Sequence, residues 1–131
     1  MRNTMTNSQE NGEAAESLVK RKYDLEAANV EWCDLTNPRT GARYEVKSAE
    51  RDRDSGREGR FRLWEDQHRS LRAADAAGSA AWYVFVTDDG ATYTRRRVSH
   101  VSQVIAENGG WNESGHRRGS RQLKIPVSEL I

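Results

Sequence analysis

The sequence predicts a single α/β (α+β) domain in which helices flank a mixed β-sheet. Three observations support this fold class. Apolar residues recur at helical spacing in three segments. Segments in which apolar and polar residues alternate lie on both sides of a turn at residues 37–41. The most apolar run, AWYVFVT at residues 81–87, has the length of a buried strand. Helix, hairpin, helix, strand, strand and helix follow one another, an order typical of helices packed around one sheet.

The first part of the chain divides into a leader, a helix and a hairpin. Residues 1–9 are polar and lack periodicity, so we expect a disordered leader before a single domain at residues 10–131. Apolar residues at helical spacing predict a helix over 10–29. Residues 30–49 predict a β-hairpin, because alternating segments lie on both sides of the turn sequence NPRTG.

The rest of the chain supplies the other elements of the sandwich. The charged, glycine-containing segment 50–60 predicts a mobile loop, and apolar periodicity ended by a glycine predicts a helix over 62–77. The apolar run 81–87 predicts a buried strand, followed by a short strand over 92–95. A third helix is expected over 98–105 and a last strand over 122–127.

Composition limits the classes of protein to which the chain can belong. Its 131 residues fit one domain. No apolar run approaches the roughly 20 residues of a membrane-spanning helix, and no signal peptide is recognisable, so we expect no membrane partner. The single cysteine, Cys33, excludes an internal disulfide and a cysteine-cluster metal site, and it favours a reducing, cytoplasmic location. Residues 95–131 carry a net charge of +4, which predicts a basic C-terminal region at about 95–124.

The hairpin carries the residues that point to chemistry. Glu45 and Lys47 are two residues apart, so their side chains lie on the same face of a strand. With the turn centred in NPRTG, Asp34 lies directly opposite Glu45, at a Cβ separation of roughly 4.5–5.5 Å. Two carboxylates that close repel one another unless a cation lies between them. A hard divalent ion such as Mg²⁺ takes such ligands and keeps open positions for a phosphate.

Asp34, ten intervening residues and the triplet Glu45-Val46-Lys47 resemble the catalytic motif of the PD-(D/E)XK nuclease superfamily, which has the restriction-endonuclease-like fold. The helical segment GEAAE at residues 12–16 and the glutamine Gln67 are similar to conserved features of the archaeal Holliday junction resolvases and their relatives. This resemblance covers about residues 11–88. It implies a restriction-endonuclease-like core with a mixed β-sheet flanked by helices.

The resemblance also implies a metal site for phosphodiester hydrolysis. Asp34, Glu45 and the backbone carbonyl of Val46 would hold Mg²⁺, for which Mn²⁺ could substitute. Glu16 matches the position of a further metal-site glutamate, and Glu13, one turn away, is the alternative. The ion would stabilise negative charge on the transition state.

Two more catalytic residues and the partners follow from the same resemblance. Lys47 would position the attacking water and offset developing charge, and Gln67 would orient water or the phosphate by hydrogen bonds. We expect a DNA endonuclease that selects junctions or other DNA structures. We also expect a homodimer, because cutting two strands requires two sites. The alternatives are an inactive nuclease-like module that binds nucleic acid, a restriction or repair nuclease of the same fold, and an enzyme that cleaves RNA.

Two basic segments are candidates for nucleic-acid contact. Arg95, Arg96 and Arg97 precede the third predicted helix, where positive charge opposes the helix dipole unless an anion such as a nucleic-acid backbone lies nearby. The loop SGHRRGSR is rich in glycine, serine and arginine and suits phosphate contact. Its candidate residues are His116, Arg117, Arg118 and Arg121. The remaining histidines, His68 and His100, lack metal-ligand spacing, and we expect both at the surface.

Overall fold

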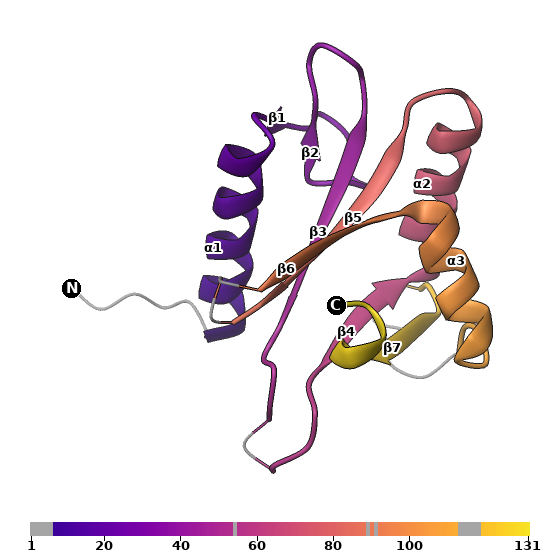
Figure 1. Ribbon diagram of the computed structural model, residues 1–131. Coiled ribbons are helices and arrows are strands. Elements are labelled where there is room, and N and C mark those ends of the chain that lie inside the picture. Colours follow the sequence, from indigo (N-terminus) through magenta and orange to yellow (C-terminus); the bar gives the residue numbers. More distant parts are fainter. Residues whose placement is uncertain (1–6, 54, 89, 91, 113–118) are drawn as a thin grey trace.

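The computed structural model confirms the predicted α/β fold class (Figure 1). A five-stranded mixed sheet forms the centre, with strands in the order β1-β2-β3-β5-β6. β3 (Arg43–Ala49) and β5 (Ala81–Thr87) are parallel, and the other neighbouring strands of this sheet are antiparallel. No helix in the described part of the chain is long and apolar enough to cross a membrane. The structure describes residues 7–53, 55–88, 90, 92–112 and 119–131.

Helices and a small second sheet cover the two faces of the central sheet (Figure 1). α1 (Asn7–Lys22) packs on one face. The other face carries α2 (Glu65–Ala76), α3 (Val98–Glu107) and the second sheet, in which β4 (Arg60–Trp64) pairs antiparallel with β7 (Gln122–Pro126). The central strands are therefore enclosed on both sides.

Side chains alternate along β5 and divide the interior into two apolar cores. Val84 and Val86 point toward the core that α1 covers. Tyr83 and Phe85 point toward the larger core, which α2, α3, β4 and β7 complete. Because both faces are covered, this strand is apolar at nearly every position, which explains why its bounds could be predicted.

The predicted hairpin register is confirmed, but its first arm is shorter than expected. Leu35 lies opposite Tyr44, as a turn centred in NPRTG requires. The strand on that side, β2 (Leu35–Thr36), has only two residues, and turns and bends occupy residues 29–34 apart from Cys33. β1 (Glu26–Ala27) then pairs with the other edge of β2, so the first helix ends earlier than predicted.

Two boundary predictions near the N-terminal half need correction. α1 begins at Asn7, inside the predicted leader, and ends at Lys22 instead of Asn29. The segment 50–60 was expected to be a mobile loop, and the structure adds an antiparallel bridge between Asp52 and Glu58 within it. β3 and β4 are thus joined by a long, partly paired hairpin, which extends below the sheet in Figure 1.

The helix predicted from residue 62 begins three residues later, because residues 60–64 form β4. Phe61 and Leu63 are fully buried while Arg60 and Arg62 are exposed, which is strand periodicity. The partner strand β7 comes from the far end of the sequence, so this pairing is non-local. The arginines expected to open the third helix also lie in a strand, β6 (Tyr93–Arg97), and α3 starts directly after them.

Candidate active site

The residues of the candidate site lie on β3 and on three neighbouring segments. Glu45 and Lys47 lie on its face toward the larger core, opposite Tyr83 and Phe85 of β5. Asp34 directly precedes β2, and its backbone N–H donates to the carbonyl of Tyr44 at 3.1 Å. Gln67 stands in the first turn of α2, and Glu16 lies on α1. The helices that carry Glu16 and Gln67 thus pack on opposite faces of the sheet.

The carboxylates of Asp34 and Glu45 converge. Asp34 Oδ2 accepts a hydrogen bond from the backbone N–H of Val46 at 2.9 Å, which holds the carboxylate against β3. Glu45 is buried, with 4% of its surface exposed. Burial raises the pKa of Glu45 to about 8, and the charge of Asp34 together with a hydrogen bond between the two carboxyls adds to this effect, while Lys47 opposes it.

Lys47 is held by two partners at once. Its Nζ lies 3.2 Å from Glu45 Oε2 and donates to Gln67 Oε1 at 2.8 Å. Gln67 is itself buried, with 7% exposure. Its amide oxygen therefore fixes the lysine ammonium beside the carboxylate of Glu45.

Glu16 lies close enough to this cluster to interact with it electrostatically. Its pKa is raised by partial burial and then by the negative charge of Asp34, although Lys20 opposes the shift. The side chain of Glu13, in contrast, is exposed. Of the two glutamates considered from the sequence, Glu16 is thus the more buried, and the charge of Asp34 acts on it.

The chemistry of this cluster fits a divalent cation. No group of three or more His, Cys, Asp or Glu side chains within the described ranges is placed to hold a metal together. Nevertheless, Glu45 Oε1 is buried and has no hydrogen-bond partner among the described residues, which is costly unless a ligand satisfies it. Oxygen donors from two carboxylates suit a cation such as Mg²⁺, which binds few protein ligands and retains several waters.

A buried polar network lies next to Glu45 in the larger core. Tyr83 is adjacent to Glu45 in the sheet register, and burial, followed by the charge of Glu45, raises its pKa well above the usual value. His68 Nδ1 lies 2.8 Å from the Tyr83 hydroxyl, and Nε2 lies 2.8 Å from Ser102 Oγ. His68 is only 4% exposed and contacts the ring of Trp111, so the prediction that it lies at the surface is wrong. Its sequence context is polar, and only the non-local partners bury it.

Arg95 is engaged in an aromatic cluster. Its guanidinium lies 4.1 Å from the centroid of the Trp82 ring and 5.0 Å from that of Tyr23. It also donates to the hydroxyl of Tyr44 at 3.3 Å. These contacts stabilise the edge of the sheet where β6 meets α1, and they give Arg95 a structural role.

The next two arginines also have partners within the protein. Arg96 Nε donates to the carbonyl of Leu130 at 3.2 Å, and Arg97 Nη2 pairs with Asp75 at 2.6 Å. From the sequence, the positive charge of these arginines was expected to oppose a helix dipole unless a nucleic acid offset it. They lie on a strand, and the anions and dipoles that balance two of them come from elsewhere in the fold.

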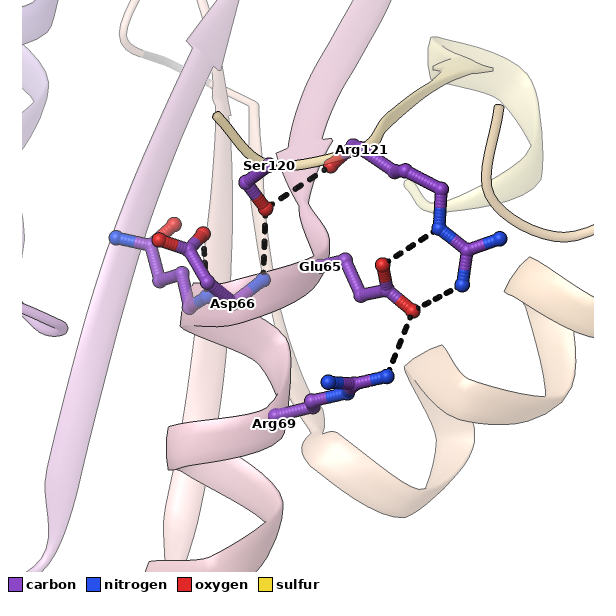
Figure 2. A network of polar contacts seen from close by, with 6 residues as sticks. Glu65, Asp66, Arg69, Ser120 and Arg121 are labelled. Atoms are coloured by element: carbon purple, nitrogen blue, oxygen red, sulfur yellow. Dashed lines mark hydrogen bonds and ion pairs between the residues drawn. The ribbon is translucent and has the colours of Figure 1, made fainter. Parts of the chain in front are cut away.

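Arg121 joins the start of α2 to the segment before β7, as Figure 2 shows. It donates to both carboxylate oxygens of Glu65, at 2.7 and 2.6 Å, while Arg69 approaches the same carboxylate at 3.2 Å. Ser120 Oγ accepts from the backbone N–H of Asp66 at 3.1 Å. Arg121 thus has an internal partner, and its expected phosphate contact stays a prediction. The other predicted residues of this loop, His116, Arg117 and Arg118, lie outside the described residues.

A basic pocket that was not predicted from the sequence lies beside the cluster. This pocket of about 490 Å³ lies where the end of β3 meets β4 and β7. Its lining includes four basic side chains, which we call the basic groove: Arg53, Arg60, Arg62 and Lys124. The alternation of arginine with apolar residues over 60–63 was the available signal, but a helix was predicted there.

Comparison with known proteins agrees with this geometry. The sequence matches the family model of the PD-(D/E)XK nuclease superfamily domain over residues 1–131, so the match includes the segment after residue 88 that the motif resemblance did not cover. No curated protein shows a significant match to the chain. Because the family model spans the whole chain, and the fold is of the restriction-endonuclease-like type, the protein belongs to the PD-(D/E)XK nuclease superfamily.

Proposed function

We propose that the protein is a metal-dependent DNA endonuclease whose active site consists of Asp34, Glu45, Lys47, Gln67 and Glu16. One observation carries the proposal. Glu45 is buried against Asp34 with an unsatisfied oxygen, beside a lysine that a buried glutamine holds in place. Such an arrangement is unfavourable as structure, because burying carboxylates together costs free energy. It is favourable for binding a cation and a phosphate.

Each residue has a defined task in this proposal. Asp34, Glu45 and the carbonyl of Val46 would hold a divalent ion, with Glu16 acting on it through water. The ion, when bound, would supply Lewis-acid stabilisation of the phosphate and a lower pKa for water.

Lys47 would contact a non-bridging phosphate oxygen or the attacking water and offset the negative charge that develops at phosphorus. Gln67 would keep the ammonium of Lys47 aimed at that position through the 2.8 Å hydrogen bond. Water then attacks phosphorus, and the bond from phosphorus to the leaving oxygen breaks.

The finer features of the activity are part of the same proposal. We infer Mg²⁺ as the metal, with Mn²⁺ as a substitute, because hard oxygen ligands favour it. We further infer a homodimer that selects DNA by its structure, for example a four-way junction. A chain of 131 residues has little length for inserts that read base edges, and cutting two strands requires two sites.

A cleavage assay tests the proposal. The full-length protein is incubated with four-way junction, flap, single-stranded and linear duplex DNA and with RNA, in Mg²⁺, Mn²⁺ or EDTA. We expect metal-dependent cleavage of at least one DNA, fastest for the junction. Failure to cut any substrate would exclude the enzyme and favour a nuclease-like binding module. A matched sedimentation experiment determines whether the active species is a dimer.

A further inference from the structure

The basic groove brings positive charge together: among its described lining residues four are cationic and one, Glu50, is acidic. Arg62 of β4 lies directly opposite Lys124 of β7, and Arg60 is two residues away on the same face. Directly opposed side chains have Cβ atoms roughly 4.5–5.5 Å apart, and like charges in such pairs destabilise a sheet. The described residues contain no ion pair between any of these three cations and a carboxylate.

The neighbouring cations also act on Lys124. Its pKa is lowered by partial desolvation and then by the charges of Arg62, Arg60 and Arg53. Arg62 does have one attractive contact, since its guanidinium lies 5.9 Å from the ring centroid of Trp64. That contact orients Arg62 along the strand, but it adds no negative charge to the groove.

Arg53 is held in the same groove by the hairpin between β3 and β4. Its backbone N–H donates to the carbonyl of Arg57 at 2.7 Å, and its carbonyl accepts from Gly56. The two arms touch at their base, where a Cβ on Gly59 would lie 1.5 Å from the carbonyl oxygen of Glu50, so only glycine fits. Within the described residues, the buried Nε of Arg53 has no hydrogen-bond partner. A buried guanidinium nitrogen without a partner is costly unless a ligand supplies an acceptor.

The groove lies beside the candidate active site along β3. Ala49 lines it and lies two residues beyond Lys47 on β3, a separation of about 7 Å along a strand. Asn11 also lines it and belongs to α1, the helix that carries Glu16. A nucleic-acid strand with one phosphate at Glu45 and Lys47 can therefore place its neighbouring phosphates in the groove.

We propose that the basic groove binds the phosphodiester backbone next to the scissile phosphate and so sets the path of the cleaved strand. This inference rests on the proposed function, because it concerns the substrate of the same site. It assigns the contact to Arg53, Arg60, Arg62 and Lys124, whereas Arg95–Arg97 and Arg121 have partners within the protein.

Binding measured without cleavage tests the groove. A labelled DNA duplex is titrated with full-length protein in EDTA at several salt concentrations, for the wild type and for the triple variant R60Q/R62Q/K124Q. Each lost phosphate contact lowers the slope of log K against log salt by about 0.9. We expect the slope to fall by about 2–3 and the affinity at low salt to fall on the order of tenfold or more.

Two control variants separate a specific groove from general charge. The variant R21Q/K22Q/R39Q removes the same charge from exposed residues at the end of α1 and in the β2–β3 turn, and it should change the slope little. The variant R60K/R62K keeps the charge and should keep most of the slope. Thermal unfolding of the groove triple should occur at the wild-type temperature or above it, because like-charge repulsion is removed.

The outcomes distinguish this inference from the nuclease proposal. Equal losses in the two triple variants, an unchanged slope in the groove triple, or no DNA binding by the wild type would overturn the groove. A groove-dependent slope in a protein that cleaves no substrate would support the groove and contradict the nuclease. Cleavage by the wild type, together with DNA binding that the groove substitutions do not change, would support the nuclease and contradict the groove.

Discussion

Replacing Glu45 with glutamine should stabilise the metal-free protein. The glutamate is 4% exposed, and its carboxyl meets Asp34 while one of its oxygens has no partner among the described residues. Glutamine keeps the shape of the side chain but cannot ionise. The cost of the buried charge is thereby removed, and Lys47 can still donate to Gln67.

The size of the effect follows from the pKa. The pKa of Glu45 rises from 4.5 to about 8 on folding, so the folded state holds a proton that the unfolded state releases between these values. The contribution of this carboxyl to stability is thus fully present below pH 4.5 and is lost as the pH rises through 8. At 1.36 kcal/mol per pKa unit, E45Q should gain about 2–5 kcal/mol at about pH 8 and little at about pH 4.5.

Urea unfolding in EDTA at about pH 5 and about pH 8 measures this gain. The matched control is Glu31→Gln, an exposed glutamate of the turn before β2, which should change the unfolding free energy by less than about 0.5 kcal/mol. The reasoning is refuted if E45Q is less stable than wild type at pH 8, or if its gain is the same at both pH values.

Three further predictions concern the metal, the buried histidine and the arginine cluster. Mg²⁺ or Mn²⁺ should raise the melting temperature of the wild type, and the shift should grow with the metal concentration. Asp34→Asn should show no such shift, and equal shifts in both proteins would place the ion elsewhere. Burial lowers the pKa of His68 to about 4, so this group destabilises the fold as the pH falls from 6.5 toward 4, by about 3 kcal/mol. The difference in unfolding free energy between wild type and His68→Gln should therefore change with pH across that range. The exposed control His100→Gln should keep the pH dependence of the wild type. Arg95→Met should lower the unfolding free energy by about 1–2 kcal/mol, because the contacts with Trp82 and Tyr23 are lost. It should leave the salt dependence of DNA binding unchanged, and a lower slope would identify Arg95 as a phosphate contact.

Local sequence signals were sufficient for the parts of the fold that depend on neighbouring residues. The NPRTG turn is closed by Asn37 Oδ1, which accepts from Arg39 N at 2.9 Å, and by Gly41 at a φ of 78°. These contacts are visible as residue types in the sequence, and they fix the register that brings Asp34 to Glu45. The apolar run of β5 likewise identifies a strand covered on both faces.

Features that depend on distant residues could not be predicted in this way. Leu63 and Trp64 fit helical spacing with Leu71, and only pairing with β7 makes them part of a strand. His68 sits in a polar segment, yet Tyr83 and Ser102 enclose it. The same limit applies to the basic groove, because Arg62 and Lys124 are far apart in sequence and opposite one another in the sheet.

Cleavage of DNA by wild type and E45Q tests the central claim most directly. Both proteins are assayed in Mg²⁺ on the fastest-cut DNA, with binding in EDTA and thermal unfolding as checks that E45Q is folded and still engages DNA. We predict metal-dependent cleavage by the wild type and a rate lower by about 10²–10³ for E45Q. Equal cleavage by the two proteins would contradict the assignment of Glu45 and Asp34 as the centre of the active site.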